Sequence, residues 1–240
     1  MVMARVRSKT TSLNAKLVQQ CHLFSQLPHD LISDITLHFR RDTWTKNTYI
    51  SQKQLLERFY ILTDGRIEMV RINPQTGRCI SLELLGPGDG FDLIALLDGK
   101  PHDMVFSPIE ALQVISVPMT KMREWIWTYP ELNQQLMIYI AQKFRERENM
   151  ATDFSLYNTR IRLSRIILKN INNHVQQQHT ISGLSDDVLS RLVGSVRQVI
   201  NQQLQTWKKE GVIEKKRNQI VVKNLQKIID DAHLSLVRAS

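Results

Sequence analysis

The chain has 240 residues, a formal net charge of +9, 42% hydrophobic residues and 23% charged residues. This length allows one large domain or two modest ones, and the composition is typical of a soluble globular protein. The absence of any run of about 18 apolar residues excludes a membrane-spanning helix, and the basic N-terminal dozen residues lack the apolar stretch of a signal peptide. With only two cysteines, Cys21 and Cys79, the chain is expected to be cytoplasmic and free of disulfides.

The positive charge is concentrated in the last third of the chain. Residues 159–240 contain 14 of the 32 Lys and Arg residues but only 6 of the 23 Asp and Glu residues, a net charge of +8. Residues 1–158 contain the other 18 Lys and Arg residues and the other 17 Asp and Glu residues, a net charge of +1. Such a basic region indicates a polyanion partner such as nucleic acid or an acidic membrane surface, and a well-solvated basic surface is the alternative.

The first half of the chain has the pattern of a β domain. Residues 17–39 predict two short helices that break near Pro28. Residues 44–118 then contain short alternating apolar runs, separated by Gly, Pro and Asn clusters such as residues 73–77. This pattern is typical of an antiparallel sandwich or barrel.

A long helix is predicted to open at Pro130 and to extend to Tyr157. Its apolar residues recur every three or four positions, in a seam that Lys143 and Arg147 interrupt. A narrow seam suits pairing between two subunits, whereas the alternative is a helix lying on the β domain of its own subunit. We favour pairing, because a single β domain offers few surfaces for so long a helix. The residues expected to pair are Leu132, Leu136, Tyr139, Ile140, Met150, Phe154 and Tyr157.

Residues 184–213 predict two helices joined by a short turn. Ser185 can cap the first helix, whose first turn is acidic. Gly194 suits the turn that ends this helix, and Ser195 is predicted to cap the second helix. Two helices joined by a short turn with glycine form a helix-turn-helix. Before it, residues 159–171 predict another helix and residues 172–183 a polar connector.

The second of these helices divides into two faces at about 100° per residue. One face is apolar apart from a polar exception, Gln203, and is expected to pack; it holds Val196, Val199, Ile200, Leu204 and Trp207. The other face holds Arg, Lys, Asn and Gln without any acid, which suits base edges and phosphates. We expect base contacts from Arg197, Gln198, Asn201 and Gln202.

A basic hairpin is predicted directly after this helix. Residues 212–213 and 220–222 look like two short strands, with residues 215–219 as the turn between them. Such a wing is well placed to contact DNA phosphates, although a cationic turn by itself is more often a solvated hairpin tip. The residues expected to contact the DNA backbone are Ser195, Gln205, Lys208, Lys209, Lys215, Lys216 and Arg217.

The order of these elements resembles the Crp/Fnr family of bacterial transcription regulators. The motifs that resemble the family are LFSQLP at 23–28, YILTDGRIEMV at 60–70, GPGDGFDLIALLDG at 86–99 and LVGSVRQVINQQL at 192–204. The resemblance implies an α+β fold with a β-roll sensor domain over residues 1–128, a dimerisation helix over 129–158 and a winged helix-turn-helix over 159–240. It further implies a homodimer that binds a pseudo-palindromic double-stranded DNA site, with RNA polymerase as a further candidate partner.

The sequence departs from the family pattern at both functional regions. The family recognition helix commonly presents an Arg-Glu pair and a second Arg, where this chain has Arg197, Gln198 and Gln202. We therefore expect a different DNA sequence preference. Cyclic-AMP-binding members carry a Gly-Glu-Leu and an Arg-Ser or Arg-Thr pair, but residues 100–106 are KPHDMVF here. Cyclic AMP is therefore not expected to bind in the family manner, and the effector is unknown. The candidate effector pocket consists of Phe91, Asp92, Leu93, His102 and Asp103.

The sequence supports no cofactor and no enzymatic activity. An iron–sulfur cluster takes four cysteine ligands, whereas this chain has two cysteines, and the histidine spacing indicates neither haem nor a metal. Nucleophile–base pairs, paired-carboxylate motifs and Gly-rich phosphate loops are missing. The alternative function is a sensor or interaction module whose C-terminal domain binds a protein instead of DNA.

Overall fold

A computed structural model describes residues 15–171, 179–216 and 219–232. Arg217, one of the predicted phosphate contacts, lies outside these residues. None of the helices among the described residues is long and apolar enough to cross a membrane.

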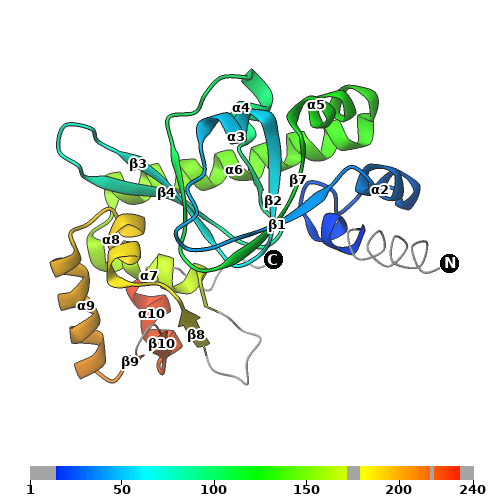
Figure 1. The fold of residues 1–240 in the computed structure, drawn as a ribbon. Helices are drawn as coiled ribbons and strands as arrows, with labels where there is room; N and C mark the ends of the chain where they lie inside the picture. The colour runs from blue at the N-terminus through cyan, green and yellow to red at the C-terminus, as the bar shows by residue number, and fades with distance from the viewer. Residues whose placement is uncertain (1–14, 172–178, 217–218, 233–240) are drawn as a thin grey trace. The chain divides into compact units, whose positions relative to one another are not determined.

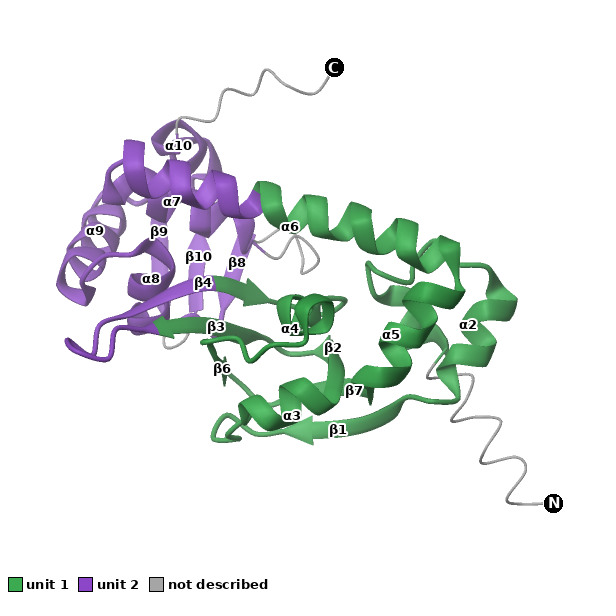
Figure 2. Cartoon of the chain, turned by 90° about the horizontal axis from the view of Figure 1, so that it is seen from above, with its two compact units in different colours: residues 1–71, 83–145 green, residues 72–82, 146–240 purple. Residues whose placement is uncertain are grey.

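The chain divides into two compact units, which Figure 2 distinguishes by colour. The first unit consists of Met1–Arg71 and Glu83–Arg145, and the second of Ile72–Leu82 and Glu146–Ser240. The predicted domain boundaries at residues 128 and 158 stay a prediction.

The predicted β domain is confirmed as a pair of antiparallel sheets (Figure 1). Its strands are β1 (Arg40–Trp44), β2 (Arg58–Asp64), β3 (Ile67–Ile72), β4 (Cys79–Leu85), β5 (Gly90–Phe91), β6 (Val105–Pro108) and β7 (Leu112–Pro118). One sheet has the order β1-β7-β2-β5 and the other has the order β4-β3-β6. The helices are α2 (His29–Thr36), α3 (Gln52–Glu57), α4 (Leu93–Asp98) and α5 (Met119–Thr128). Pro28 is the residue before α2, as the predicted break requires.

Strand β2 is buried on both faces of its sheet, because successive side chains of a strand point to opposite sides. Phe59 and Ile61 pack into the hydrophobic cluster on the helical side. Tyr60 points to the other side and stacks on Phe91, with ring centroids 5.7 Å apart. Phe91 in turn stacks at 5.2 Å on Phe106 of the second sheet, so aromatic rings fill the space between the two sheets.

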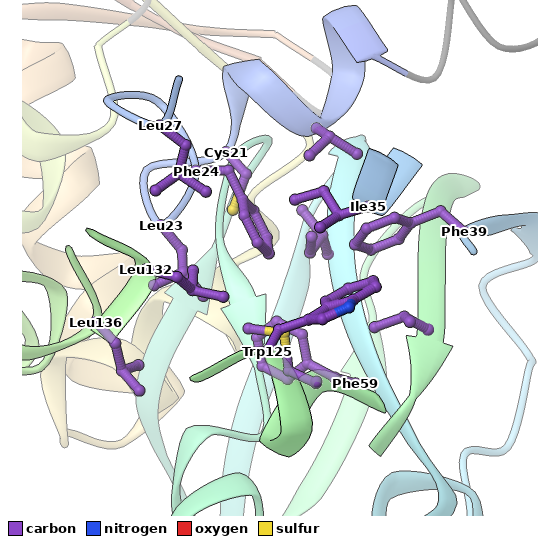
Figure 3. Close-up of a cluster of buried hydrophobic side chains, with 14 of the residues drawn as sticks. Cys21, Leu23, Phe24, Leu27, Ile35, Phe39, Phe59, Trp125, Leu132 and Leu136 are labelled. Atoms are coloured by element: carbon purple, nitrogen blue, oxygen red, sulfur yellow. The ribbon is translucent and has the colours of Figure 1, made fainter. Parts of the chain in front are cut away.

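Helix α6 (Pro130–Leu156) confirms the predicted long helix, but its first half is buried by its own unit. Leu132 and Leu136 belong to the same cluster as Phe59 and Trp125 (Figure 3). Tyr139 belongs to this cluster too. Ile140 packs partly against this cluster. The prediction that Leu132, Leu136 and Tyr139 pair with a second subunit is therefore wrong, whereas the pairing of the partly buried Ile140 stays a prediction. The first half of α6 lies instead on the β domain of its own subunit, because it covers a large apolar surface on one side of the sheet.

Lys143, the first of the two cations that interrupt the predicted seam, forms buried ion pairs. Lys143 Nζ lies 2.7 Å from Glu83 Oε1 and 2.8 Å from Asp89 Oδ1, both of the same unit. The Tyr139 hydroxyl donates to the same Asp89 oxygen at 2.9 Å. Burial alone raises the pKa of Asp89, but the nearby Lys143 ammonium brings that pKa below its ordinary value. Lys143 therefore attaches α6 to the β domain.

The second unit contains a winged helix-turn-helix. Its elements are α7 (Thr159–Lys169), β8 (His179–Ser182), α8 (Asp186–Val193), α9 (Arg197–Lys209), β9 (Ile213–Lys216), β10 (Gln219–Val222) and α10 (Leu225–Asp231). The three strands form one sheet in the order β8-β10-β9. Part of the expected polar connector is therefore a strand, β8, which pairs with β10. This strand has no clear signal in the sequence, because four residues are too few for a visible alternation.

Candidate nucleic-acid interface

Helix α8 begins and ends where its sequence signals predict. The Ser185 hydroxyl accepts from the Val188 amide at 3.3 Å, and Asp186 and Asp187 occupy the first turn. The helix ends at Gly194 in the left-handed conformation, with φ of 64°. The Gly194 amide donates to the carbonyls of the last turn, which closes the helix.

The turn between α8 and α9 requires glycine for two reasons. Its positive φ strains any residue with a side chain. In addition, a Cβ at Gly194 would lie 2.9 Å from Cε1 of Phe154, a residue near the end of α6. Phe154 also lies under the Arg162 guanidinium, at 5.3 Å, and Tyr157 under that of Arg165, at 4.1 Å. These aromatic residues, predicted to pair between subunits, thus contact their own unit, whereas Met150 is half-buried and its role stays a prediction.

Helix α9 begins one residue later than its predicted cap. Val196 is the N-cap and makes no side-chain capping bond, so the prediction of a Ser195 cap is wrong. The physical reason is that Ser195 belongs to the preceding turn. Its amide donates to the Ser190 carbonyl at 2.9 Å, which is the long bond of a Schellman motif.

The packing face of α9 is narrower than predicted. Ile200, Leu204 and Trp207 are fully buried, but Val196 and Val199 are exposed. Val199 lies about 100° around the helix from the centre of the buried residues. Val196 is the N-cap and precedes the first helical turn, so the helical spacing does not determine which way its side chain points. Two valines therefore join the exposed surface at the start of α9.

The predicted polar face of α9 is accessible. Arg197, Gln198 and Gln202 are exposed at its N-terminal half, and Asn201 is partly exposed. The predicted backbone contacts Gln205, Lys208 and Lys209 are exposed toward its C-terminal end. Arg and Gln side chains bind guanine and adenine edges, and a valine methyl fits the thymine methyl. The surface therefore carries groups that suit guanine, adenine and thymine edges, although each residue's contact stays a prediction.

Two acids of α8 bind cations of this surface. Asp187 Oδ1 lies 3.4 Å from Arg197 Nη1. Lys215 Nζ lies 2.6 and 2.7 Å from the two carboxylate oxygens of Asp186. These four residues line a pocket of about 220 Å³, together with Leu184, Ser185, Lys216, Gln219 and Ile220. Sequence reasoning did not identify the pairing, because the partners lie on different elements.

The basic residues of the wing lie on a strand and not in the predicted turn. Lys215 and Lys216 belong to β9, opposite Ile220 and Gln219 of β10. Lys216 Nζ lies 3.4 Å from Glu214, whose carboxylate also accepts from Lys223 at 3.1 Å. The hydrogen bond from Lys223 and the Lys216 charge lower the pKa of Glu214. The strand runs further than predicted because Ile213 to Lys216 pair fully with β10.

A polar network joins the buried face of α9 to neighbouring helices. The Trp207 indole donates to Asp231 Oδ2 at 2.9 Å, and Arg160 Nη2 donates to the same oxygen at 2.6 Å. Burial alone raises the pKa of Asp231, but these hydrogen bonds bring it below its ordinary value. The network attaches α9 to α7 and α10, and sequence spacing offers no signal for it.

The structure brings only some of the candidate effector residues together. Phe91 lies in the ring cluster, and the buried Asp92 caps α4 and lies 3.0 Å from Nδ1 of His102. Leu93 packs against the separate helical cluster, and Asp103 is exposed and pairs with Arg71 at 3.1 Å. The structure therefore brings Asp92 and His102 together but not Leu93 and Asp103, because β5 and the start of α4 direct neighbouring side chains to different sides, and an effector pocket stays a prediction.

Two family models match the chain in this order. The cyclic nucleotide-binding domain matches residues 43–129, and the Crp-like helix-turn-helix domain matches residues 161–230. A CRP-like cAMP-activated global transcriptional regulator of Mycobacterium tuberculosis is 22% identical over 186 residues, which cover 76% of this chain and 83% of that protein.

Solved structures show the same fold. FixK2 from Bradyrhizobium japonicum superposes with a TM-score of 0.72 at 16% identity, covering 82% of this chain and 98% of FixK2. The c-di-GMP responsive global regulator CLP of Xanthomonas campestris has a TM-score of 0.66 at 13% identity, covering 81% and 99%. The two family models together match more than half of the chain, on the β domain and the winged helix-turn-helix that the structure contains, and the chain therefore belongs to the Crp/Fnr family of DNA-binding transcriptional regulators.

Proposed function

We propose that this regulator acts as a homodimer that recognises a pseudo-palindromic DNA site through α9. The observation that supports this most directly is the exposed start of α9, where Arg197, Gln198 and Gln202 lie beside two exposed valines. A helix of this composition fits the major groove, and two copies would contact half-sites about one duplex turn apart. The dense positive charge of the C-terminal region supports strong phosphate attraction.

The homodimer would form through the face of α6 that its own unit leaves open. Met137, Ile138 and Phe144 are large hydrophobic residues that are exposed on this face. Met137, Ala141 and Phe144 are spaced by four and then three residues, which is the spacing of a coiled-coil seam. A second copy of the same helix fits such a seam, since a twofold interface pairs one surface with itself. This face replaces the seam first predicted.

We further propose that the sensor domain of this chain does not bind cyclic AMP in the usual manner. The M. tuberculosis relative is described as cAMP-activated, and a bound cyclic phosphate requires donors. Here the corresponding region carries the buried Asp92 and the exposed Asp103, both acids that repel a phosphate. The stacked rings of Tyr60, Phe91 and Phe106 also occupy the space between the sheets. Isothermal titration with cyclic AMP is expected to give no stoichiometric heat, and micromolar binding would contradict this.

The expectations of no iron–sulfur cluster, no haem, no metal and no enzymatic activity stay predictions, as does contact with RNA polymerase. No group of three His, Cys, Asp or Glu side chains that could hold a metal ion occurs in the part of the chain that the structure describes.

In vitro selection tests the DNA-binding proposal. The full chain is incubated with randomised duplexes of about 30 bp, which accommodate two half-sites one turn apart, and bound duplexes are sequenced. The wild type should enrich one pseudo-palindromic sequence, and Arg197→Ala should lose the enrichment. Arg78→Ala is the matched control, because Arg78 is an exposed arginine of the β3–β4 turn. Failure of the wild type to enrich any sequence would refute the proposal.

A further inference from the structure

The acidic first turn of α8 contacts the residue that we expect to recognise a base. Asp187 Oδ1 lies 3.4 Å from Nη1 of Arg197, the first residue of α9. We propose that Asp187 is a specificity-determining residue, whose carboxylate positions the Arg197 guanidinium for base recognition and limits its attraction to phosphates. This inference rests on the proposed role of Arg197.

The neighbouring ion pair shows how Asp187 differs from a structural acid. The side chains of Asp186 and Lys215 are 13% and 26% exposed, and their short contacts attach α8 to the wing strand β9. The side chains of Asp187 and Arg197 are 53% and 63% exposed. Ion pairs between such exposed side chains contribute little to folding stability. A role of the Asp187–Arg197 pair in DNA binding therefore explains it better than a role in folding stability.

The first consequence of the pair is positional. A guanidinium has five N–H donors, and guanine takes two of them in a bidentate contact. Asp187 contacts Nη1, which leaves other donors of Arg197 for a base edge. A free arginine side chain loses much rotamer freedom when it binds, whereas a partner that already holds it reduces that loss. Asp187 should therefore favour the contact with the correct base.

The second consequence is electrostatic. A helix N-terminus close to DNA attracts phosphates through its free amides, but Asp186 and Asp187 place two negative charges there. The partial neutralisation of Arg197 by Asp187 reduces its attraction to any phosphate, whatever the base sequence. Non-specific binding should therefore weaken more than specific binding, which raises the ratio between them.

The test compares three variants of the full chain on two labelled duplexes. The first duplex is the sequence that the wild type selects, and the second is a shuffled version of the same composition. Asp187→Asn removes the charge at the pair, and Asp187→Glu retains it. Asp230→Asn is the matched control, since it changes the net charge equally at an exposed position of α10, where Gln226 Nε2 donates to Asp230 at 2.8 Å. Thermal melting of each variant verifies that it is folded.

We expect Asp187→Asn to bind the shuffled duplex up to about eightfold more tightly at 0.1 M salt. Each phosphate contact multiplies the binding constant by about the salt concentration to the power −0.9, and this factor is about 8 at 0.1 M. Its plot of log affinity against log salt should steepen by about 0.9 for the same reason. Affinity for the selected duplex should not rise, so the specificity ratio should fall. Asp187→Glu and Asp230→Asn should keep the wild-type ratio.

Two results would overturn the inference while the proposed function stands. One is a wild type that selects a site and an Asp187→Asn variant with the same specificity ratio. The other is an equal effect of Asp187→Asn and Asp230→Asn on both duplexes, which would reveal an effect of net charge alone. A wild type that selects no sequence would instead refute the proposed function and, with it, any role of Asp187 in specificity.

Discussion

Replacement of Phe144 by alanine should dissociate the proposed dimer. Phe144 is 64% exposed, and in the proposed seam its ring would be covered by the second copy of α6. A phenylalanine side chain presents about 200 Å² of apolar surface. The exposed fraction therefore leaves about 130 Å² for each protomer, or about 260 Å² for the two copies. At about 25 cal/mol for each Å², burial of both rings stabilises the dimer by up to about 6 kcal/mol.

Part of this free energy is offset by ordering of the rings and by incomplete burial. Loss of even half of this stabilisation, about 3 kcal/mol, raises the dissociation constant of the dimer more than 100-fold. Sedimentation velocity over a range of protein concentrations measures this constant. The wild type should sediment as a dimer at concentrations where Phe144→Ala sediments as a monomer.

Trp127→Ala provides the matched control for this experiment. Trp127 is 85% exposed on α5, outside the proposed seam, so its replacement removes a larger exposed apolar side chain. It should leave the dissociation constant unchanged. A Phe144→Ala variant that remains as dimeric as the wild type would refute the assignment of the interface to this face of α6, and so would a monomeric wild type.

Three further changes test the packing and the interface. Leu136→Ala should lower the free energy of unfolding by about 2–5 kcal/mol in urea titrations, because Leu136 is fully buried in the core of the first unit. Asp231→Asn should destabilise the wing domain by about 1–3 kcal/mol at neutral pH, since hydrogen bonds from Arg160 and Trp207 favour the charged carboxylate. The folded-state pKa of Asp231 is depressed, so this contribution is present above the ordinary pKa of 3.8 and disappears as the pH falls below it. The difference between Asp231→Asn and wild type in urea titrations should therefore shrink toward pH 3, and a constant difference would contradict the reasoning. Val199→Ser should weaken the preference for thymine at one position of the selected site by about 1 kcal/mol, the scale of one lost buried methyl contact, as measured by competition binding.

The helix-turn-helix could be predicted from the sequence because its signals are local. The Ser185 cap, the acidic first turn and the left-handed Gly194 lie within ten residues, and each acts on its own helix end. The burial of Ile200, Leu204 and Trp207 follows from helical spacing alone. Ser195 was misassigned because a cap and the last residue of a Schellman turn look alike in sequence.

The pairs at the candidate site could not be predicted in the same way. Asp186 and Lys215 are separated by 29 residues, and Asp231 meets Arg160 across 71 residues. Charged and polar residues are common on any surface, so their spacing does not identify a partner on another element. The same reason explains why neither the ring cluster nor the support behind Trp207 was expected.

The sequence by itself determined the order of the elements, the family and the polar surface of α9, because these depend on local periodicity, turns and caps. The tertiary structure decided which side of α6 is free. Leu132, Leu136 and Tyr139 follow one stripe, and Met137, Ala141 and Phe144 follow another with the same spacing. Periodicity cannot choose between two such stripes, since both suit a partner. Only the apolar outer surface of the β2–β7 sheet, built from distant parts of the chain, buries the first stripe and leaves the second exposed.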